Sequence, residues 1–400
     1  MKIGIDCRTI LNPGFGENAG IGHYTYYLVN KLLELDKENQ YILFFDNLLS
    51  KDAVEKMIGD KKNVEIRFFP FHKYKHYLPF VFSHILISAT LEKEKLDLFH
   101  SPTGSLPLSY KGKSIVTVHD LAIYQHPEWF PSNFLVGQKF STKTIVPKSL
   151  KKAKKIIAVS RCTKRDIQKN FKIKGDKIKV IYEGVEFRDL PAREGETCGV
   201  ISKICFDDLK AKYGLKDNYL FFIGTIEPRK NIEGIIKAFC NLIKDDKELR
   251  EKYQLVLAGA KGWKHKGVFK VIEECSKNFD GEKTIKYLGY VPAEDKYALL
   301  KNASCFVFPS LYEGFGLPVL EALSLGVPTI TSKISSLPEI ARDVAVLVDP
   351  NNTEKISEGM RKILANKKFR DELSRKGAER AKNFSWEKCA RETLEVYKSV

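Results

Sequence analysis

The segment Pro309-Ser-Leu-Tyr-Glu-Gly-Phe-Gly-Leu-Pro-Val-Leu-Glu-Ala322 decides the fold of this chain. It closes a short apolar run, Cys305–Pro309, which predicts a buried strand, and it leads into a helical pattern over Pro318–Leu325. Proline suits the first turn of a helix, where its missing N–H would have no partner. A strand, a glycine-bearing loop and a helix in this order are typical of a parallel α/β unit. The free backbone N–H groups near Gly316 and Leu317 then predict a site for a diphosphate.

Short apolar runs of the same kind alternate with longer amphipathic stretches along the whole chain, which predicts an α/β fold with two parallel sheets. In the first half we expect strands at Lys2–Cys7, Tyr41–Asp46, Val64–Phe69, Leu98–Ser101, Ser114–His119, Lys155–Ser160 and Lys179–Tyr182. In the second half we expect them at Tyr219–Gly224, Gln254–Ala258, Thr284–Leu288, Cys305–Pro309, Pro328–Thr331 and Ala345–Val348. Helical patterns cover Ile21–Leu35, Arg161–Asn170, Asp207–Tyr213, Asn231–Lys244, Pro292–Lys301, Pro318–Leu325 and most of Thr353–Val400.

The length of 400 residues exceeds that of one ordinary domain. Residues Glu186–Cys205 show neither the strand pattern nor the helix pattern of apolar residues, and we interpret them as a linker or an irregular insertion. We therefore expect an N-terminal domain over residues 1–190, a C-terminal domain over 191–382 and a final helix over 383–400 that returns to the first domain. Because open parallel sheets bind ligands at the carboxyl ends of their strands, two facing sheets predict a central cleft that concentrates function.

The balance of 67 basic and 50 acidic residues gives a net charge of +17. A basic surface attracts phosphate-bearing partners such as nucleotide sugars, nucleic acids or anionic lipids. The lysines are scattered over the whole chain, and no zinc-finger, RNA-recognition or helix-turn-helix signature is present. We therefore expect solvated lysine-rich faces and no nucleic acid partner.

The chain opens with Met1-Lys-Ile-Gly-Ile-Asp-Cys7, which predicts a strand and lacks the pattern of a secretory signal. The longest apolar stretch, Tyr77–Leu91, is interrupted by polar residues and is too short to span a bilayer. We therefore expect a cytoplasmic protein.

None of the eight cysteines belongs to a Cys-x-x-Cys pair. Cys7, Cys240 and Cys305 lie inside apolar runs, while Cys198 and Cys205 lie close together in the connecting region. We expect most of the cysteines to be buried small hydrophobic residues, without metal ligation and without a disulfide framework.

A second motif, Gly224-Thr-Ile-Glu-Pro-Arg-Lys-Asn231, joins the strand Tyr219–Gly224 to the next helix. Arg229 and Lys230 precede that helix, where cations oppose the helix dipole, so an anionic ligand is the better explanation for them. Arginine binds phosphate through two hydrogen bonds and lysine acts as a point charge. Both can stabilise the negative charge that develops on a departing diphosphate.

Seven residues separate Glu313 from Glu321, and with its flanking residues this pair resembles the glutamate signature of retaining glycosyltransferases of family 4. That resemblance implies the GT-B architecture, in which two Rossmann-like domains face a central cleft. It also implies that Glu313 contacts the donor sugar, that Glu321 contacts the donor ribose, and that Arg229 and Lys230 clamp the donor phosphates. Thr225 is a departure, because many members have arginine directly after the glycine.

The segment Thr117-Val-His-Asp-Leu121 resembles the His-Asp segment of the same family. The resemblance implies that His119 contacts the donor sugar near the reacting carbon. Asp120 either orients His119 or caps the next turn. Ser160 and Arg161 end another strand, and they either line the cleft or serve as a helix cap and a surface arginine.

Several of the remaining residues that we expect to bind the donor are glycines. The loop Asn12–His23 follows the first strand but lacks a clean Gly-x-Gly-x-x-Gly spacing, so dinucleotide binding is a weaker alternative for it. By resemblance, Gly20 and Gly22 contact the donor or the acceptor. Further donor-binding residues expected by resemblance or from the helix start are Tyr290, Val291, Gly314, Phe315, Gly316, Leu317 and Glu321.

The resemblance implies a retaining hexosyltransferase that moves mannose from GDP-mannose to a glycan or a lipid-linked acceptor. Glucose or N-acetylglucosamine from UDP donors stays open, as do a same-fold epimerase or hydrolase and a non-catalytic nucleotide-sugar-binding subunit. The chain contains no Asp-x-Asp, and Arg229, Lys230 and a helix dipole can stabilise the charge. We therefore expect no metal and no other cofactor, with the nucleotide sugar as a co-substrate.

Two basic regions raise the possibility of contact with an anionic membrane. Residues Phe68–Ile87 interleave aromatic side chains with histidines and lysines, and Lys148–Lys155 contains five lysines. Basic and aromatic residues together suit an anionic membrane interface. The alternative is a helix with a solvated basic face.

Overall fold

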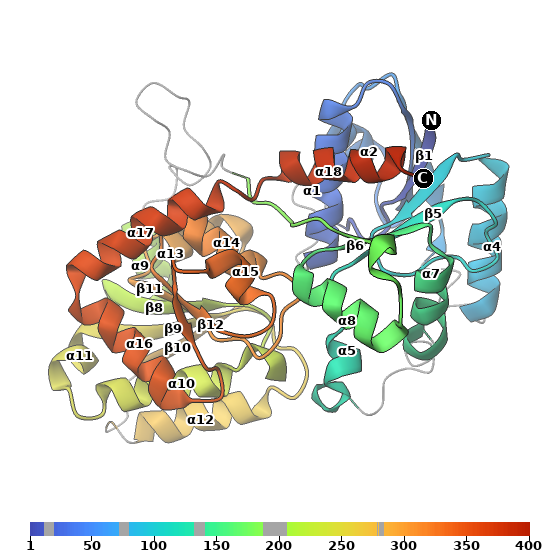
Figure 1. Cartoon of the computed structure of the whole chain (residues 1–400). Coiled ribbons are helices and arrows are strands. Elements are labelled where there is room, and N and C mark those ends of the chain that lie inside the picture. The colour runs from blue at the N-terminus through green and yellow to red at the C-terminus, as the bar shows by residue number, and fades with distance from the viewer. Residues whose placement is uncertain (12–19, 72–79, 132–140, 187–205, 278, 280–283) are drawn as a thin grey trace. The chain divides into compact units, whose positions relative to one another are not determined.

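The structure is a computed structural model that describes the chain except for residues 12–19, 72–79, 132–140, 187–205, 278 and 280–283, and the side chains of 80–84. The chain forms two compact units. Unit 1 comprises Met1–Gln125, Asn133–Gly184 and Ser385–Val400, and unit 2 comprises His126–Ser132 and Val185–Phe384. Each unit is built on one parallel sheet with flanking helices (Figure 1).

The sheet of unit 1 has seven strands in the order β3-β2-β1-β4-β5-β6-β7. These strands are β1 Lys2–Asp6, β2 Gln40–Asp46, β3 Val64–Phe69, β4 Leu98–Ser101, β5 Ser114–Val118, β6 Lys155–Ala158 and β7 Ile178–Val180. The helices are α1 Gly20–Leu35, α2 Lys51–Ile58, α4 Phe80–Lys93, α5 Ala122–Gln125, α7 Val146–Lys152, α8 Arg161–Phe171 and α18 Trp386–Lys398. In β2 every residue after Gln40 is buried, as expected for a parallel strand covered on both faces.

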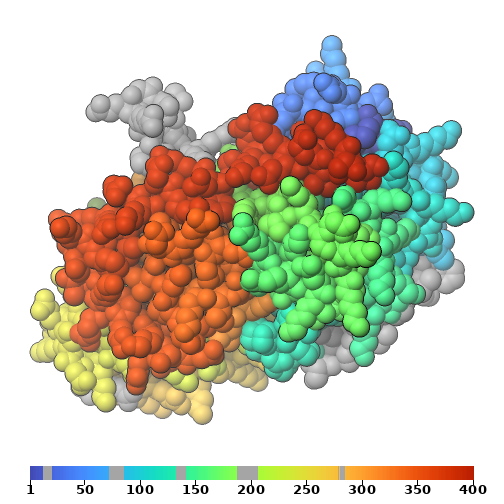
Figure 2. All heavy atoms as spheres, in the orientation of Figure 1, coloured from blue at the N-terminus to red at the C-terminus, as the bar shows by residue number. Residues whose placement is uncertain are grey.

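The sheet of unit 2 has six strands in the order β10-β9-β8-β11-β12-β13. These strands are β8 Asn218–Ile223, β9 Tyr253–Ala258, β10 Ile285–Gly289, β11 Cys305–Phe308, β12 Thr329–Ser332 and β13 Val346–Val348. The helices are α9 Phe206–Tyr213, α10 Ile232–Ile243, α11 Lys247–Lys252, α12 Lys266–Lys277, α13 Ala293–Lys301, α14 Leu317–Ser324, α15 Leu337–Ala341, α16 Thr353–Ala365 and α17 Lys367–Ala381. Helices α16 and α17 lie at the surface of this unit (Figures 1 and 2).

The alternation expected from the sequence is confirmed in both units. Every predicted strand is present, and the observed ends differ from the predicted ones by two residues at most. The larger differences have a local cause. The strand predicted over Lys155–Ser160 ends at Ala158, because Ser160 caps α8 by accepting a hydrogen bond from the Thr163 N–H at 3.0 Å.

The C-terminal helix α18 belongs to unit 1 and packs along α1. Its first residue, Trp386, is buried and stacks on Tyr27 with ring centroids 5.4 Å apart. The Ser385 side chain caps the helix by accepting from the Lys388 N–H at 3.1 Å. Aromatic packing and a cap together fix the start of α18 on the first unit.

A buried histidine joins α18 to the sheet of unit 1. The His100 ring on β4 contacts the Tyr397 hydroxyl through Nδ1 at 2.8 Å and the Thr117 hydroxyl through Nε2 at 2.9 Å. Burial, together with the nearby His119, lowers the pKa of His100 to about 3. The ring is therefore neutral in the folded protein, and both of its nitrogens are hydrogen-bonded.

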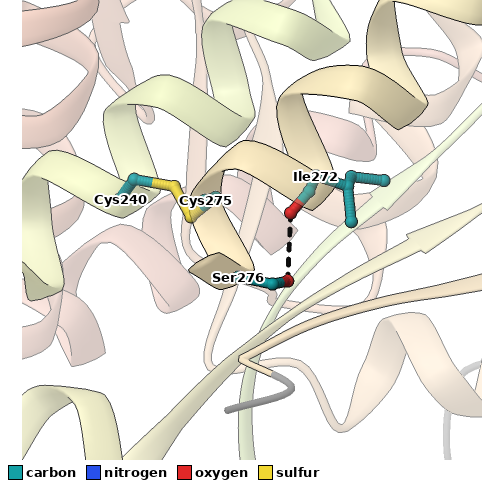
Figure 3. The surroundings of a disulfide bond; sticks show 4 residues. All are labelled: Cys240, Ile272, Cys275 and Ser276. Carbon is teal, nitrogen blue, oxygen red and sulfur yellow. Dashed lines mark hydrogen bonds between the residues drawn. A yellow bond between two sulfur atoms is a disulfide. The ribbon is translucent and has the colours of Figure 1, made fainter. Parts of the chain in front are cut away.

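The expectation that Cys240 is a free buried residue is wrong. Cys240 on α10 forms a disulfide with Cys275 on α12, and their Cα atoms lie 6.3 Å apart (Figure 3). The two helices pack side by side, which brings together cysteines that are 35 residues apart in the sequence.

The remaining described cysteines, Cys7, Cys162, Cys305 and Cys389, are free and buried, which confirms the expectation for Cys7 and Cys305. Cys198 and Cys205 lie outside the described residues.

None of the helices in the described part of the chain is long and apolar enough to cross a membrane. The apolar stretch around Ile87 forms part of α4, whose Ile87 and Leu91 are buried against the sheet of unit 1.

His100 makes the stability of the protein sensitive to acid. Its pKa falls from 6.5 to about 3 on folding, so between these values the unfolded chain binds a proton that the folded chain does not. The free energy of unfolding should therefore be unaffected by His100 above pH 6.5. Below that value it should fall by up to about 1.4 kcal/mol per pH unit.

Urea unfolding at a series of pH values measures this slope. We expect His100→Gln to flatten it and His126→Gln, whose side chain is 40% exposed, to leave it unchanged. Equal slopes in the wild type and His100→Gln would contradict the assignment.

Candidate functional site

The candidate site of unit 2 lies where the strand order changes direction. Strands β8 and β11 are neighbours in the sheet, but the chain leaves them toward opposite edges, β9 on one side and β12 on the other. Loops that follow such a pair diverge and leave room for a ligand at the carboxyl ends of the strands. The loop after β8 carries Arg229 and Lys230, and the loop after β11 carries Glu313.

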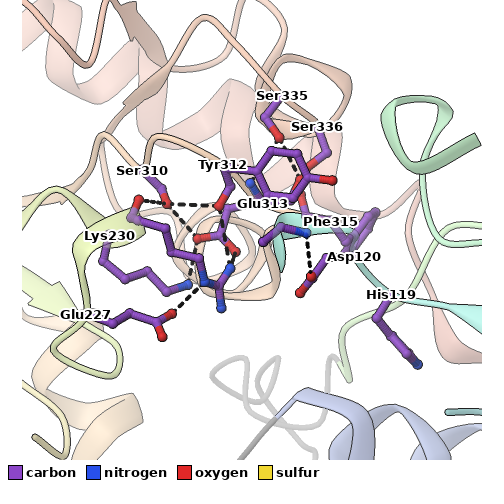
Figure 4. Close-up of polar contacts among 12 residues, drawn as sticks. His119, Asp120, Glu227, Lys230, Ser310, Tyr312, Glu313, Phe315, Ser335 and Ser336 are labelled. Atoms are coloured by element: carbon purple, nitrogen blue, oxygen red, sulfur yellow. Dashed lines mark hydrogen bonds and ion pairs between the residues drawn. The ribbon is translucent and has the colours of Figure 1, made fainter. Parts of the chain in front are cut away.

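Glu313 pairs with both cations of the neighbouring loop (Figure 4). Its Oε1 accepts from the Lys230 ammonium at 2.6 Å, and its Oε2 accepts from the Arg229 guanidinium at 3.0 Å. The Lys230 ammonium also lies 4.9 Å from the centre of the Phe308 ring. Glu313 and Lys230 are only 6% and 7% exposed, so the pair is desolvated and each partner depends on the other.

Two further side chains complete this cluster, and the sequence motifs did not reveal either one. The buried Glu227 carboxylate accepts from the Arg229 Nε at 2.5 Å. The buried Ser310 hydroxyl lies 2.7 Å from Glu313 Oε1. Both residues stand inside the quoted motifs, but only the fold shows that they face Arg229 and Glu313 (Figure 4).

The charges of the cluster control its titration. Burial raises the pKa of the Glu313 carboxyl, but Lys230 and Arg229 outweigh that effect, and the net result is a lowered pKa. Burial, with the like charge of Arg229, lowers the pKa of the Lys230 ammonium. Glu313 is therefore an anion that two cations hold in place.

The backbone of the Glu313 loop is fixed by side chains of the following segment. The Ser335 and Ser336 hydroxyls donate to the Glu313 carbonyl at 2.6 and 2.9 Å, and Ser336 also reaches the Phe315 carbonyl at 2.7 Å. Gly316 has φ 117°, and a Cβ there would lie 2.7 Å from Leu337 Cδ2. The loop therefore requires glycine at the position that starts α14.

Helix α14 begins at Leu317 with Gly316 as its N-cap residue and Pro318 in its first turn. The expected helix start next to the Glu313 loop is therefore present, together with the buried Phe315 and the adjacent Gly314. Glu321 is buried in this helix, where its Oε1 accepts from the Lys296 ammonium at 2.7 Å and from the Tyr297 hydroxyl at 3.2 Å. Lys296 and Tyr297, on α13, are partners that the sequence did not suggest.

The other residues expected to bind the donor lie at strand ends or at a helix start. Tyr290 and Val291 follow β10, with Tyr290 56% exposed and Val291 buried. In unit 1, Gly20 starts α1 and Gly22 is buried within it. The rest of the glycine-rich loop, residues 12–19, lies outside the described residues.

His119 follows β5 of unit 1, and of the two alternatives for its neighbour Asp120 the structure shows the turn cap. Asp120 caps the next turn by accepting from the Ala122 N–H at 3.0 Å. The His119 ring contacts Glu183 instead, through Nδ1 at 2.9 Å. Of the two alternatives for Ser160, the structure shows the helix cap, and Arg161 is exposed at the start of α8.

Comparisons with known proteins identify the family. Residues 206–380 match the protein family described as "Glycosyl transferases group 1", and residues 19–188 match the family described as "Glycosyltransferase Family 4". The chain is 35% identical to the O-antigen chain mannosyltransferase B of Escherichia coli over 302 residues, which cover 75% of this chain and 74% of that protein. The chain belongs to glycosyltransferase family 4.

Two other proteins extend the comparison. The serotype-specific mannosyltransferase WbdA of Escherichia coli is 29% identical over 301 residues, which cover 74% of this glycosyltransferase but 35% of WbdA. The structure of Anabaena Alr3699/HepE in complex with UDP and glucose has a TM-score of 0.71 at 16% identity, with all of both chains covered. At that identity the likeness shows the fold, which is GT-B with two Rossmann-like domains.

In the described residues, no group of three or more histidine, cysteine, aspartate or glutamate side chains could hold a metal ion.

Proposed function

We propose that this glycosyltransferase is a retaining mannosyltransferase that transfers mannose from GDP-mannose to a glycan or a lipid-linked acceptor. The observation that carries the proposal is the Arg229–Lys230–Glu313 cluster, which lies at the switch point of the unit 2 sheet beside the start of α14. Such a site suits a diphosphate with a sugar attached. The names of the two Escherichia coli relatives support mannose as the sugar.

In this cluster, a diphosphate can replace the Glu313 carboxylate as the anion that contacts Lys230. Lys230 is buried, and its charge is stabilised by Glu313 at 2.6 Å. A ligand that takes Lys230 must bring negative charge of its own, because an uncompensated buried cation is costly. A diphosphate does so, and it frees Glu313 to accept hydrogen bonds from sugar hydroxyls.

The remaining roles follow from position and from the family resemblance. We assign Glu321 to the donor ribose, the backbone of Tyr290 and Val291 to the nucleotide base, and His119 to the donor sugar. We further assign the acceptor to unit 1 and the donor nucleotide to unit 2. Since Arg229 and Lys230 can stabilise the departing diphosphate, the proposed reaction needs no metal.

Turnover of nucleotide sugars tests this proposal. Lys230→Ala should lower turnover of GDP-mannose by about 100-fold or more, because a preorganised cation at the departing diphosphate is lost. Release of GDP and formation of a mannosylated product are the measurements, with UDP-glucose and UDP-N-acetylglucosamine as competing donors.

Lys333→Ala is the matched control, because Lys333 is an exposed lysine of the same unit whose side chain is 54% exposed. Unchanged turnover in Lys230→Ala would overturn the phosphate assignment. Free mannose or an epimer as the sole product, even with acceptor glycans present, would favour a hydrolase or an epimerase.

We also propose that unit 1 contacts an anionic membrane surface. A hollow in this unit is lined by Lys151, Lys154, Lys155, Lys172, Ile173, Lys174, Asp176 and Lys177. Six lysines thus face a single acid, and within the described part of the chain none of the six forms an ion pair with a carboxylate. Burial and the like charge of Lys154 lower the pKa of Lys177, so the lysines repel one another unless an anion is bound.

The five lysines of Lys148–Lys155 do not all serve this surface. The Lys152 ammonium donates to the Leu108 and Tyr110 carbonyls and is held inside the unit. The first basic region, around residues 72–79, lies outside the described residues.

Liposome flotation tests the membrane contact. Replacement of Lys151, Lys154 and Lys155 by glutamate should abolish flotation with vesicles rich in phosphatidylglycerol, since each basic residue near such a surface contributes about 1 kcal/mol. Replacement of Lys51, Lys56 and Lys62 by glutamate changes the net charge equally and should leave flotation intact. Equal flotation of both variants would exclude the hollow as the contact surface.

A further inference from the structure

The loop after β7 places a buried carboxylate against the histidine of unit 1. Glu183 is 4% exposed, and its Oε1 lies 2.9 Å from His119 Nδ1. In the described part of the chain, His119 is the one side chain that pairs with Glu183. A buried carboxylate is stable only when it is paired and hydrogen-bonded, so Glu183 depends on the His119 ring for its charge.

The second nitrogen of the ring also faces an acceptor. His119 Nε2 lies 3.0 Å from the Pro102 carbonyl oxygen, which can only accept a hydrogen bond. A neutral imidazole has one N–H and one lone pair, so it cannot donate to both Glu183 and Pro102. An imidazolium can donate to both.

The surroundings fix this arrangement. The Tyr24 ring packs edge-on against His119, with centroids 4.6 Å apart. The neighbouring Gly184 is wedged against the start of α18, because a Cβ there would lie 2.2 Å from the Trp386 nitrogen. The backbone next to Glu183 is therefore packed closely against the start of α18, and Tyr24 covers one side of the His119 ring.

Among the described residues, the titratable groups near the His119 ring include Glu183, Tyr24, His100 and Asp120. Glu183 stabilises the imidazolium directly, while Tyr24 is neutral because burial raises its pKa. His100 is neutral, and its lowered pKa reflects burial and then the charge of His119. The Asp120 carboxylate is turned to the Ala122 N–H. Of these groups, Glu183 is the one whose side chain contacts a nitrogen of the His119 ring.

We propose that Glu183 is the positioning residue of His119, which it holds as an imidazolium so that Nε2–H is presented as a hydrogen-bond donor. In the free enzyme this N–H donates to the Pro102 carbonyl. The role of that donor toward a hydroxyl of the donor sugar rests on the proposed function, whereas the Glu183–His119 pair does not. A cationic donor forms a stronger hydrogen bond to a sugar hydroxyl oxygen than a neutral imidazole does.

Nuclear magnetic resonance of nitrogen-15 histidine tests the pair without any ligand. The chain has eight histidines, and the signals lost in His119→Gln identify the ring in question. In the wild type at neutral pH we expect both nitrogens of His119 to carry protons. In Glu183→Gln the amide can donate to Nδ1, so we expect a neutral ring with a proton on Nε2 alone. A neutral ring in the wild type, or a doubly protonated ring in Glu183→Gln, would overturn the proposal.

Turnover of GDP-mannose tests the functional part. Glu183→Gln should lower kcat by about 10- to 100-fold with a smaller change in KM, because the donor group is displaced or weakened. In a His119→Gln background the same substitution should have no further effect, since Glu183 acts through His119. Glu38→Gln, an exposed glutamate of unit 1, is the control.

Equal losses in both backgrounds would show that Glu183 acts independently of His119 and would overturn its positioning role. If the wild type turns over no nucleotide sugar, the proposed function fails. The magnetic resonance measurement then still tests whether Glu183 holds His119 in its doubly protonated form.

Discussion

The buried ion pair between Lys230 and Glu313 connects the ends of the two central strands of unit 2. Strands β8 and β11 are hydrogen-bonded neighbours, yet residues 230 and 313 are 83 residues apart in the sequence. The pair forms because β8 and β11 are parallel neighbours, so the loops that follow their carboxyl ends lie at the same edge of the sheet. Glu227, Arg229 and Ser310 gather around it, and Ser335, Ser336 and Gly316 fix the loop that carries the glutamate.

The charges of this cluster explain how one site can be both stable and reactive. Two carboxylates, Glu227 and Glu313, face two cations, Arg229 and Lys230, so the set is neutral as a whole. A neutral set can be buried at moderate cost, whereas removing either partner of a buried pair is strongly destabilising. Exchange of the Glu313 carboxylate for a diphosphate oxygen keeps the buried Lys230 paired with an anion. The proposed donor therefore replaces an interaction that the protein already makes.

The strands could be predicted from the sequence for a physical reason, and so could the central residues of the site. Parallel strands are buried on both faces, so many of them form continuous apolar runs, such as residues 41–45 of β2 and Cys305–Phe308, that stand out from their surroundings. Arg229, Lys230 and Glu313 belong to compact motifs that directly follow such runs. Their proximity then follows from the order of the strands.

Partners that come from distant segments could not be predicted. Glu183 lies 64 residues after His119, and the sequence offered only the adjacent Asp120 as a possible partner, with a turn cap as the alternative that the structure shows. The link between Cys240 and Cys275 depends on the packing of α10 against α12, which no local pattern reveals. Glu227 and Ser310 are ordinary loop residues until the fold turns them toward Arg229 and Glu313.

A crystal structure of the enzyme with GDP-mannose would test the central claim most directly, through the distances from Lys230 Nζ to the diphosphate and to Glu313. The account predicts that a diphosphate oxygen takes the place of Glu313 Oε1 on Lys230, and that the freed carboxylate contacts the sugar. A bound nucleotide sugar with the Lys230–Glu313 pair intact and the diphosphate elsewhere would contradict it.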